Sequence, residues 1–183
     1  VAQELYEGVD IEGMGATGLI TYMRTDSLRI SDVAKEEAAQ YILNRFGEKF
    51  LPAKPRVFKT KSNAQDGHEA IRPSMPSLSP EDVKASLTSD QFKLYNLIWN
   101  RFMASQMSDC IQKTTQAEIS AKEYIFKASG YYVDFEGFTT LYVESKDTEE
   151  EKSTQLPPLE KDMPVKCKEL KKNQHFTQPP ARY

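Results

Sequence analysis

The chain has 183 residues, 39% of them hydrophobic and 28% charged, which is the composition of an ordinary globular protein with a real core. No apolar run approaches the ~20 residues of a membrane span, and no leader pattern opens the chain, so neither is expected. The formal net charge of −3 argues against binding of nucleic acid over the whole surface.

Charge is nevertheless uneven along the chain. The stretch from 49 to 61 carries five cations and no acid: Lys49, Lys54, Arg56, Lys59 and Lys61. Such a run is typical of a local phosphate track, and the alternative is a solvated loop. The two cysteines, Cys110 and Cys167, are too few for a disulfide framework or a metal-ligand set, and they fit a reducing cytosol.

The first half of the chain carries helix signals. Residues 1 to 7 read as the end of a helix, and four glycines between 8 and 18 predict a loop. Ser31 or Asp32 caps a helix that runs to about Phe46, where Gly47 stops it. Its predicted apolar face consists of Val33, Ala38, Ile42 and Phe46.

Residues 48 to 78 are rich in Pro, Lys and Ser and are expected to be mostly loop. A helix then starts at 79 to 82, with Pro80 at its first position. Thr88 and Gln91 have the form of a capping box that opens a long helix to about Met107. Its predicted core face consists of Phe92, Tyr95, Ile98 or Trp99, and Phe102.

The apolar period changes from helical to alternating near residue 109. Short runs at 115–119, 124–126, 131–135 and 139–143 predict an antiparallel meander. An acidic loop at 144–155 and a last strand at 164–170 follow. The predicted fold class is therefore multi-domain α and β, with a mainly helical domain over 1–108. Part of an antiparallel β domain, incomplete at its C-terminal end, follows over 109–183.

The segment from Ile20 to Ser27 carries the most informative chemistry. A tyrosine phenol with a pKa near ~10 is a weak nucleophile until a cation or a base favours the phenolate. Arg24 is always charged, and its planar fork matches two phosphate oxygens. In an extended segment Tyr22 and Arg24 would face the same side and could meet one phosphate together. The alternative is a half-buried strand tyrosine beside a surface arginine.

Three strings, in order, carry a resemblance to one family: Gly18–Ser27, His68–Pro73 and His175–Tyr183. Together they resemble the motifs of bacterial type IA DNA topoisomerases, topoisomerase I in particular, with Tyr22 at the position of the active-site tyrosine. Met23 fits that branch of the family. Gly67 and Ser74 depart from the usual alanine and threonine, but neither replaces a reacting group.

This resemblance implies an isomerase that needs no ATP. Tyr22 is expected to attack a single-stranded DNA phosphodiester, form a 5′-phosphotyrosine intermediate and later reseal the strand, which relaxes negatively supercoiled DNA. Arg24 is expected to be catalytic and to bind DNA, and His68 and Arg72 to bind DNA. Asp26 and Ser27 are expected to brace the loop by hydrogen bonds, Glu69 is a candidate partner for Arg72, and His175 is interpreted as structural.

The resemblance also implies what lies outside this sequence. No metal cluster is visible here, and magnesium is expected on a domain absent from this chain, so a fragment inactive alone is expected. The expected partners are single-stranded DNA and the remaining domains of the same polypeptide, in a cytoplasmic, nucleoid-associated monomer without a membrane anchor.

Two other classes stay open. One is a non-catalytic module that binds single-stranded nucleic acid through the basic run, with Tyr22 as a stacking residue. The other is a purely structural or interaction domain, which would have no salt-dependent affinity for DNA.

Overall fold

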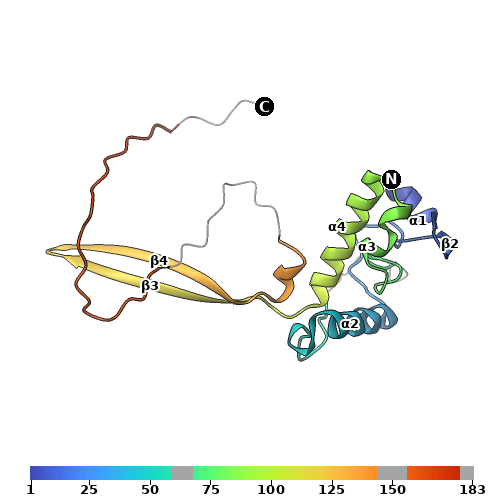
Figure 1. Ribbon diagram of the computed structural model, residues 1–183, viewed down its shortest axis with the longest axis horizontal. Coiled ribbons are helices and arrows are strands. Elements are labelled where there is room, and N and C mark those ends of the chain that lie inside the picture. The colour runs from blue at the N-terminus through green and yellow to red at the C-terminus, as the bar shows by residue number, and fades with distance from the viewer. Residues whose placement is uncertain (59–67, 144–155, 178–183) are drawn as a thin grey trace. The chain divides into compact units, whose positions relative to one another are not determined.

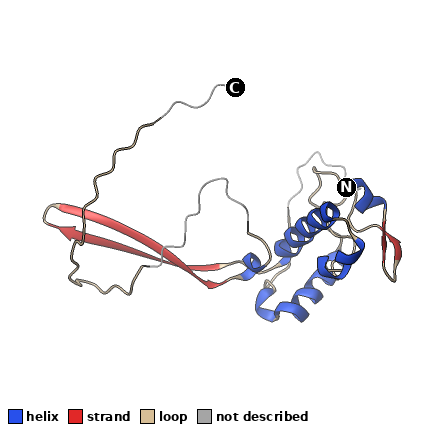
Figure 2. Cartoon of the chain, turned by 45° about the horizontal axis from the view of Figure 1, so that its top comes forward, coloured by secondary structure: helices blue, strands red, loops and turns tan. Residues whose placement is uncertain are grey.

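The structure is a computed structural model that describes residues 1–58, 68–143 and 156–177. The helices in these ranges are α1 (Ala2–Glu7), α2 (Asp32–Phe46), α3 (Pro80–Val83) and α4 (Ser89–Gln106), with short 3-10 turns η1 (Glu48–Phe50), η2 (Lys84–Ser86) and η3 (Gly137–Thr140). The strands are β1 (Val9–Ile11), β2 (Gly15–Thr17), β3 (Ile111–Ala121) and β4 (Tyr124–Phe135). Figures 1 and 2 show these elements in chain order and by type.

Contacts divide the chain into two units. The first comprises Val1–Lys113 and Val133–Glu151, and the second comprises Thr114–Tyr132 and Lys152–Tyr183. The expected mixture of helices and antiparallel strands is confirmed, whereas domains with the bounds 1–108 and 109–183 stay a prediction. The predicted loop at 144–155 lies outside the described residues.

The core of the first unit is built around α4. Its inward residues Tyr95, Trp99, Phe102 and Met103 are buried at helical spacing, and the apolar pattern predicts the first three. The predicted core residue Phe92 is only partly buried and lies outside the core cluster. The polar ends of the two large rings are satisfied, because the Tyr95 hydroxyl donates to Leu78 O at 2.7 Å and the Trp99 indole donates to Pro76 O at 3.0 Å. The aromatic stripe of α4 is therefore core and not a surface for stacking bases.

The predicted helix boundaries are confirmed. Ser31 caps α2 by accepting a hydrogen bond from Ala34 N, and Gly47 ends the helix with φ 96. Thr88 and Gln91 form the capping box of α4. One predicted core residue of α2 is wrong: Val33 is 75% exposed, and the buried positions are Ala34, Ala38 and Ile42, which share a face at a spacing of four.

The predicted loop at 8–18 is partly wrong, because it contains a small antiparallel hairpin. Strand β1 pairs with β2, with Val9 opposite Thr17 and Ile11 opposite Gly15. Gly13 and Gly15 have φ values of 80 and 72, which let the chain turn this tightly, and Ile11 is buried in the core. Three-residue strands with so many glycines leave too short an alternation to detect in the sequence.

The predicted meander of short strands is also wrong. Residues 111–135 form one long hairpin, β3 and β4, whose turn includes Lys122 at φ 53. Ion pairs join its strands, Lys113 with Asp134 at 3.0 Å and Lys127 with Glu118 at 3.1 Å. Gly130, which lies between the runs 124–126 and 131–135 predicted as separate strands, is inside β4, and residues 137–140 form the turn η3 instead of a strand.

The residues that flank the two ends of this hairpin are joined to one another within the first unit. Ser108 N donates to Phe50 O at 2.8 Å, and Phe138 N donates to Ser108 O at 3.0 Å. The Arg56 guanidinium donates to Met107 O and to the Asp109 carboxylate, at 3.0 and 2.5 Å. A side chain at Gly137, which has φ 51, would overlap the carbonyl oxygens of Ser108 and Asp109, so glycine is required there.

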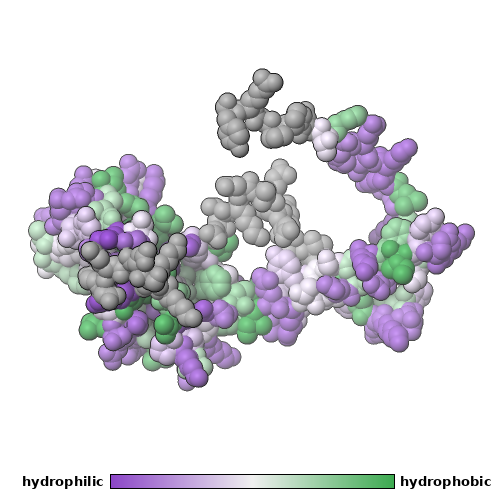
Figure 3. Space-filling model, turned by 180° about the vertical axis from the view of Figure 1, so that it is seen from behind, coloured by the Kyte–Doolittle hydropathy of each residue, from purple (hydrophilic) through white to green (hydrophobic). Residues whose placement is uncertain are grey.

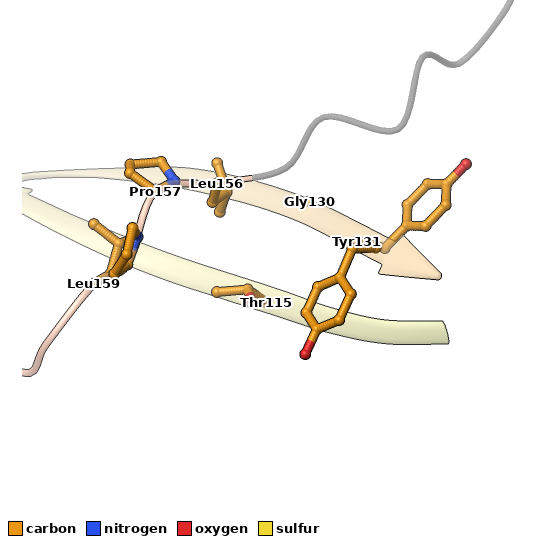
Figure 4. Close-up of a pocket in the computed structure, with 8 residues that line it drawn as sticks. Thr115, Gly130, Tyr131, Leu156, Pro157 and Leu159 are labelled. Carbon is orange, nitrogen blue, oxygen red and sulfur yellow. The ribbon is translucent and has the colours of Figure 1, made fainter. Parts of the chain in front are cut away.

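The second unit has little core of its own. Apolar side chains are exposed among polar ones (Figure 3), including Tyr124, Ile125 and Phe126 on β4. Leu156, Pro157 and Leu159 border a shallow pocket of about 350 Å³ against Thr115 and Tyr131 (Figure 4). The predicted strand at 164–170 is wrong: within the described 156–177 the chain forms no strand, because no neighbour pairs with it. No described helix is long and apolar enough to cross a membrane.

Candidate active site

The first two motifs, far apart in the sequence, lie side by side in the first unit. Ile20 and Pro73 form an isolated antiparallel bridge. Thr21 N donates to Arg72 O at 2.9 Å, and Ser74 N donates to Leu19 O at 2.9 Å. Leu19, Ile20 and Pro73 are fully or almost fully buried, so this pairing is anchored in the core.

Side chains tighten the same junction. The Thr21 hydroxyl donates to Ala70 O at 2.7 Å, and the Ser27 hydroxyl donates to His68 O at 2.6 Å. Ser27 is buried, which makes the bond it supplies costly to lose. The expected bracing role of Ser27 is thus visible in its contacts. Thr21 has the same role, although its place in the motif gave no separate signal.

Tyr22 stands on the surface immediately after this junction. Its side chain is 52% exposed, and its backbone carbonyl accepts a hydrogen bond from Arg24 N at 2.9 Å, which closes a tight three-residue turn. The extended conformation assumed from the sequence is therefore wrong. Tyr22 and Arg24 still lie on either side of a residue that points inward, as the extended segment would have placed them, because Met23 packs against the core between the exposed Tyr22 and the half-buried Arg24.

Arg24 joins Tyr22 to the second motif. Its Nη1 lies 3.3 Å from both ring nitrogens of His68, and its Nε donates to the Asp26 carboxylate at 2.7 Å. That hydrogen bond holds the pKa of Asp26 below its usual range and raises the pKa of Arg24. Among the described residues no partner takes Nη2 of Arg24, which leaves a donor available to an anion near His68.

His68 completes the group. Its ring centroid lies 6.4 Å from that of Tyr22, at an interplanar angle of 42°. The structure thus brings Tyr22, Arg24 and His68 together on one surface of the first unit. A phenol beside an arginine and an imidazole is chemically suited to attack on a phosphodiester, because both neighbours can donate hydrogen bonds to phosphate oxygens.

Arg72, the remaining predicted site residue, is placed differently. It is only 8% exposed, and its guanidinium donates to the Glu69 carboxylate at 2.5 Å and to Pro73 O at 2.8 Å. A further bond of 3.3 Å reaches the Ser31 hydroxyl that caps α2. The expected pairing with Glu69 is present. Contact of Arg72 with DNA stays a prediction, and its burial instead makes it part of the frame under the motif.

Tyr6, on the last turn of α1, is a neighbour that sequence reasoning missed. Its ring lies edge-on against Tyr22, with centroids 5.4 Å apart and planes at 69°. No local motif marks Tyr6, because the contact depends on how α1 meets the segment from 18 to 20. His175, by contrast, is exposed and belongs to the second unit, and the third motif beyond residue 177 lies outside the described residues.

The acidic residues of this surface do not form a magnesium site. Within 1–58, 68–143 and 156–177 no three His, Cys, Asp or Glu residues are grouped to hold a metal ion. The two carboxylates of the motifs, Asp26 and Glu69, are each paired with an arginine, which competes with a cation for the same oxygens.

Comparison with known proteins defines the class. The sequence model of the family described as DNA topoisomerase matches residues 1–183, and the chain therefore belongs to this family, in its bacterial type IA branch. The chain is similar to full-length topoisomerase I from Thermotoga maritima, with 41% sequence identity and a TM-score of 0.65 over 81% of its own length. It spans 23% of the length of that protein.

Proposed function

We propose that Tyr22 is the nucleophile of a DNA strand cleavage and religation reaction that relaxes negatively supercoiled DNA. The observation that carries the proposal is that the half-exposed Tyr22 ring lies near the His68 ring, with centroids 6.4 Å apart, and that the Arg24 guanidinium contacts the same His68 ring at 3.3 Å. Membership of the topoisomerase family supports it, because that family acts on DNA strands.

In the proposed step the Tyr22 hydroxyl oxygen attacks the phosphorus of a phosphodiester in single-stranded DNA. A bond forms between that oxygen and the phosphorus, and the bond from phosphorus to the 3′ oxygen breaks. The phenolic proton is lost, a proton is taken up by the 3′ oxygen, and the 5′ phosphate stays on Tyr22. Religation is the reverse attack by the 3′ hydroxyl, so the bond energy is conserved and no ATP is consumed.

Arg24 has the electrostatic role in this proposal. The transition state gains negative charge on the non-bridging phosphate oxygens, and a preorganised cation beside them lowers the barrier. Asp26 fixes the Nε side of the guanidinium, so Nη2 is held ready and need not be oriented during the reaction. His68 is proposed to hold the DNA backbone as a hydrogen-bond donor or a charge, and not to act as the general base.

Magnesium is proposed to bind on another domain of the full-length polypeptide. The carboxylates of this surface do not fit such a site, and no step of the reaction is assigned to them as metal ligands. The proposed partners are single-stranded DNA and those further domains, in a cytoplasmic, nucleoid-associated monomer. The 183-residue chain alone is proposed to be inactive.

The test uses the full-length enzyme with magnesium and a labelled single-stranded oligonucleotide. Tyr22→Phe should leave affinity for the oligonucleotide within a few-fold and eliminate the covalent adduct, since phenylalanine has no nucleophilic oxygen. Tyr142→Phe is a matched control, because it removes a hydroxyl that accepts from Arg101 instead. A protein–DNA adduct that persists in Tyr22→Phe would refute the nucleophile assignment.

A second function is favoured by the same rings. Tyr6, Tyr22 and His68 form a surface cluster of flat side chains, which is the kind of platform on which single-stranded bases stack without chemistry. Under that function Tyr22→Phe would be nearly harmless, and wild-type full-length enzyme would form no covalent adduct at all.

A further inference from the structure

The ring of Tyr6 touches the proposed nucleophile but takes no part in the proposed chemistry. Its centroid is 5.4 Å from that of Tyr22 with the planes at 69°, the edge-to-face geometry that aromatic pairs favour. Tyr6 is 39% exposed and Tyr22 52% exposed, so the pair lies at the surface of the first unit.

The backbone beneath this pair is fixed. Leu19 N donates to Leu5 O at 2.7 Å, and Ile20 N donates to the same oxygen at 3.4 Å. A side chain at Gly18 would come within 2.7 Å of Tyr6 O, so the segment that leads to Tyr22 passes directly against the last turn of α1. Leu5 is fully buried, which ties that turn to the core.

Tyr22 itself stands in a turn outside any helix or strand, and its ring has two rotatable bonds. Among the residues that the structure describes, the rings of Tyr6 and His68 are the aromatic neighbours that limit its orientations. A contact of this geometry changes the population of one orientation by about two- to tenfold. Since attack requires the phenol oxygen to approach phosphorus in line, that population enters the rate directly.

We propose that Tyr6 is a positioning residue that orients the Tyr22 ring for attack, an inference that rests on the proposed function of Tyr22. The contact uses the edge and face of the rings, so the Tyr6 hydroxyl is not required. Cleavage and religation pass through the same transition state, so loss of the contact slows both by a similar factor and leaves their ratio unchanged.

The experiment measures single-turnover cleavage and religation by full-length enzyme on a labelled single-stranded oligonucleotide, with affinity measured separately. Tyr6→Leu should slow both reactions by about three- to tenfold, with less than a twofold change in affinity and in the cleavage equilibrium. Tyr6→Phe should restore both rates to within about twofold of wild type. Tyr142→Leu removes a ring that packs on Arg101 instead, and it should retain both rates.

Each rate is divided by the fraction of enzyme molecules able to form an adduct, so that a folding defect does not mimic slow chemistry. If Tyr6→Leu folds poorly, Tyr6→Met is used in its place. Wild-type rates in Tyr6→Leu, a loss confined to affinity, or equal losses in Tyr6→Leu and Tyr6→Phe would each overturn the proposal. Tyr22→Phe is measured in parallel, and any adduct that it forms is mapped to its residue. An adduct on Tyr22→Phe refutes the nucleophile assignment. If Tyr22→Phe forms no adduct but Tyr6→Leu cleaves and religates at wild-type rates, the positioning role alone is refuted.

Discussion

Three charged or nucleophilic side chains from the two motifs differ in how the fold holds them. Tyr22 is half exposed, Arg24 is half buried and open on Nη2, and Arg72 is buried against Glu69. Exposure of the first two suits groups that must reach a substrate. Burial of the third suits a group that stabilises the protein, so substitutions should separate into effects on rate and effects on folding.

Arg24 belongs to the first kind. Arg24→Ala in the full-length enzyme should lower the single-turnover cleavage rate about 10²-fold or more, in line with loss of one preorganised donor. Affinity for single strands should fall much less, because one phosphate contact among several supplies only part of the electrostatic attraction. Arg24→Lys should restore activity only in part, since it keeps the charge but loses the fork. Equal losses in rate and affinity would reduce Arg24 to a binding contact.

Arg72 belongs to the second kind. Arg72→Met in the 183-residue chain should lower the free energy of unfolding by about 3 kcal/mol, because it leaves the Glu69 carboxylate without its partner. The double variant with Glu69→Gln should recover much of that loss, since no unpaired charge then remains. Urea unfolding measures both. An Arg72→Met chain as stable as the wild type would contradict the proposed stabilising role of the buried Arg72.

The elements of the chain fall into those with local signals and those that depend on distant pairing. The capping residues Ser31, Gly47 and Thr88 act on their own helices, so the sequence alone predicts the ends of α2 and α4. The bridge from Ile20 to Pro73 joins positions far apart, and no local pattern specifies it. The motifs identify Tyr22, Arg24 and His68, but only the fold brings them together.

Errors in the β half have the same origin. Gly130 reads as a strand break, yet the partner strand β3 carries the ladder across it. Residues 164–170 alternate like a strand, yet alternation produces no strand without a neighbour to accept its hydrogen bonds. Tyr6, in the helical half, was missed for a similar reason, because its contact with Tyr22 depends on how α1 packs against the segment before Tyr22.

The central helix α4 gives a prediction on pH. Burial raises the pKa of Tyr95, so its neutral form is favoured in the folded state. The stability this contributes is fully present below the ordinary tyrosine pKa of ~10 and is lost as pH rises above it, by about 1.4 kcal/mol per pH unit. Urea unfolding between pH 9 and 11 should show the free energy of unfolding level off below about pH 10 and begin to fall with that slope above it. Tyr95→Phe should be less stable at pH 8, having lost the bond to Leu78 O, and should lack this contribution to the slope.

At the scale of the whole molecule, the two units differ in how much apolar surface they bury. The first has a continuous core from Leu5 to Met107, whereas Tyr124, Ile125 and Phe126 of β4 are more than half exposed. A two-stranded hairpin with this much exposed apolar surface is marginally stable in water.

Hydrogen exchange of the 183-residue chain should reflect this difference. Amides of β3 and β4 between Thr114 and Tyr132 should exchange at least about tenfold faster than those of α4 between Tyr95 and Met103, because local opening of a hairpin with few buried apolar contacts costs little. The measurement is exchange followed by mass spectrometry at neutral pH, with the α2 segment around Ala38 as a protected reference. Equal protection in hairpin and helix would contradict the expectation.

The meeting of Ser108, Asp109 and Gly137 has a consequence for the evolution of the chain. The residues just before β3 and just after β4 are hydrogen-bonded to one another within the first unit, so the backbone of that unit closes there whatever the length of sequence between them. Changes in the length of β3 and β4 are therefore expected to leave the path of the chain around Tyr22 unchanged, whereas a side chain at Gly137 would overlap the carbonyl oxygens of Ser108 and Asp109.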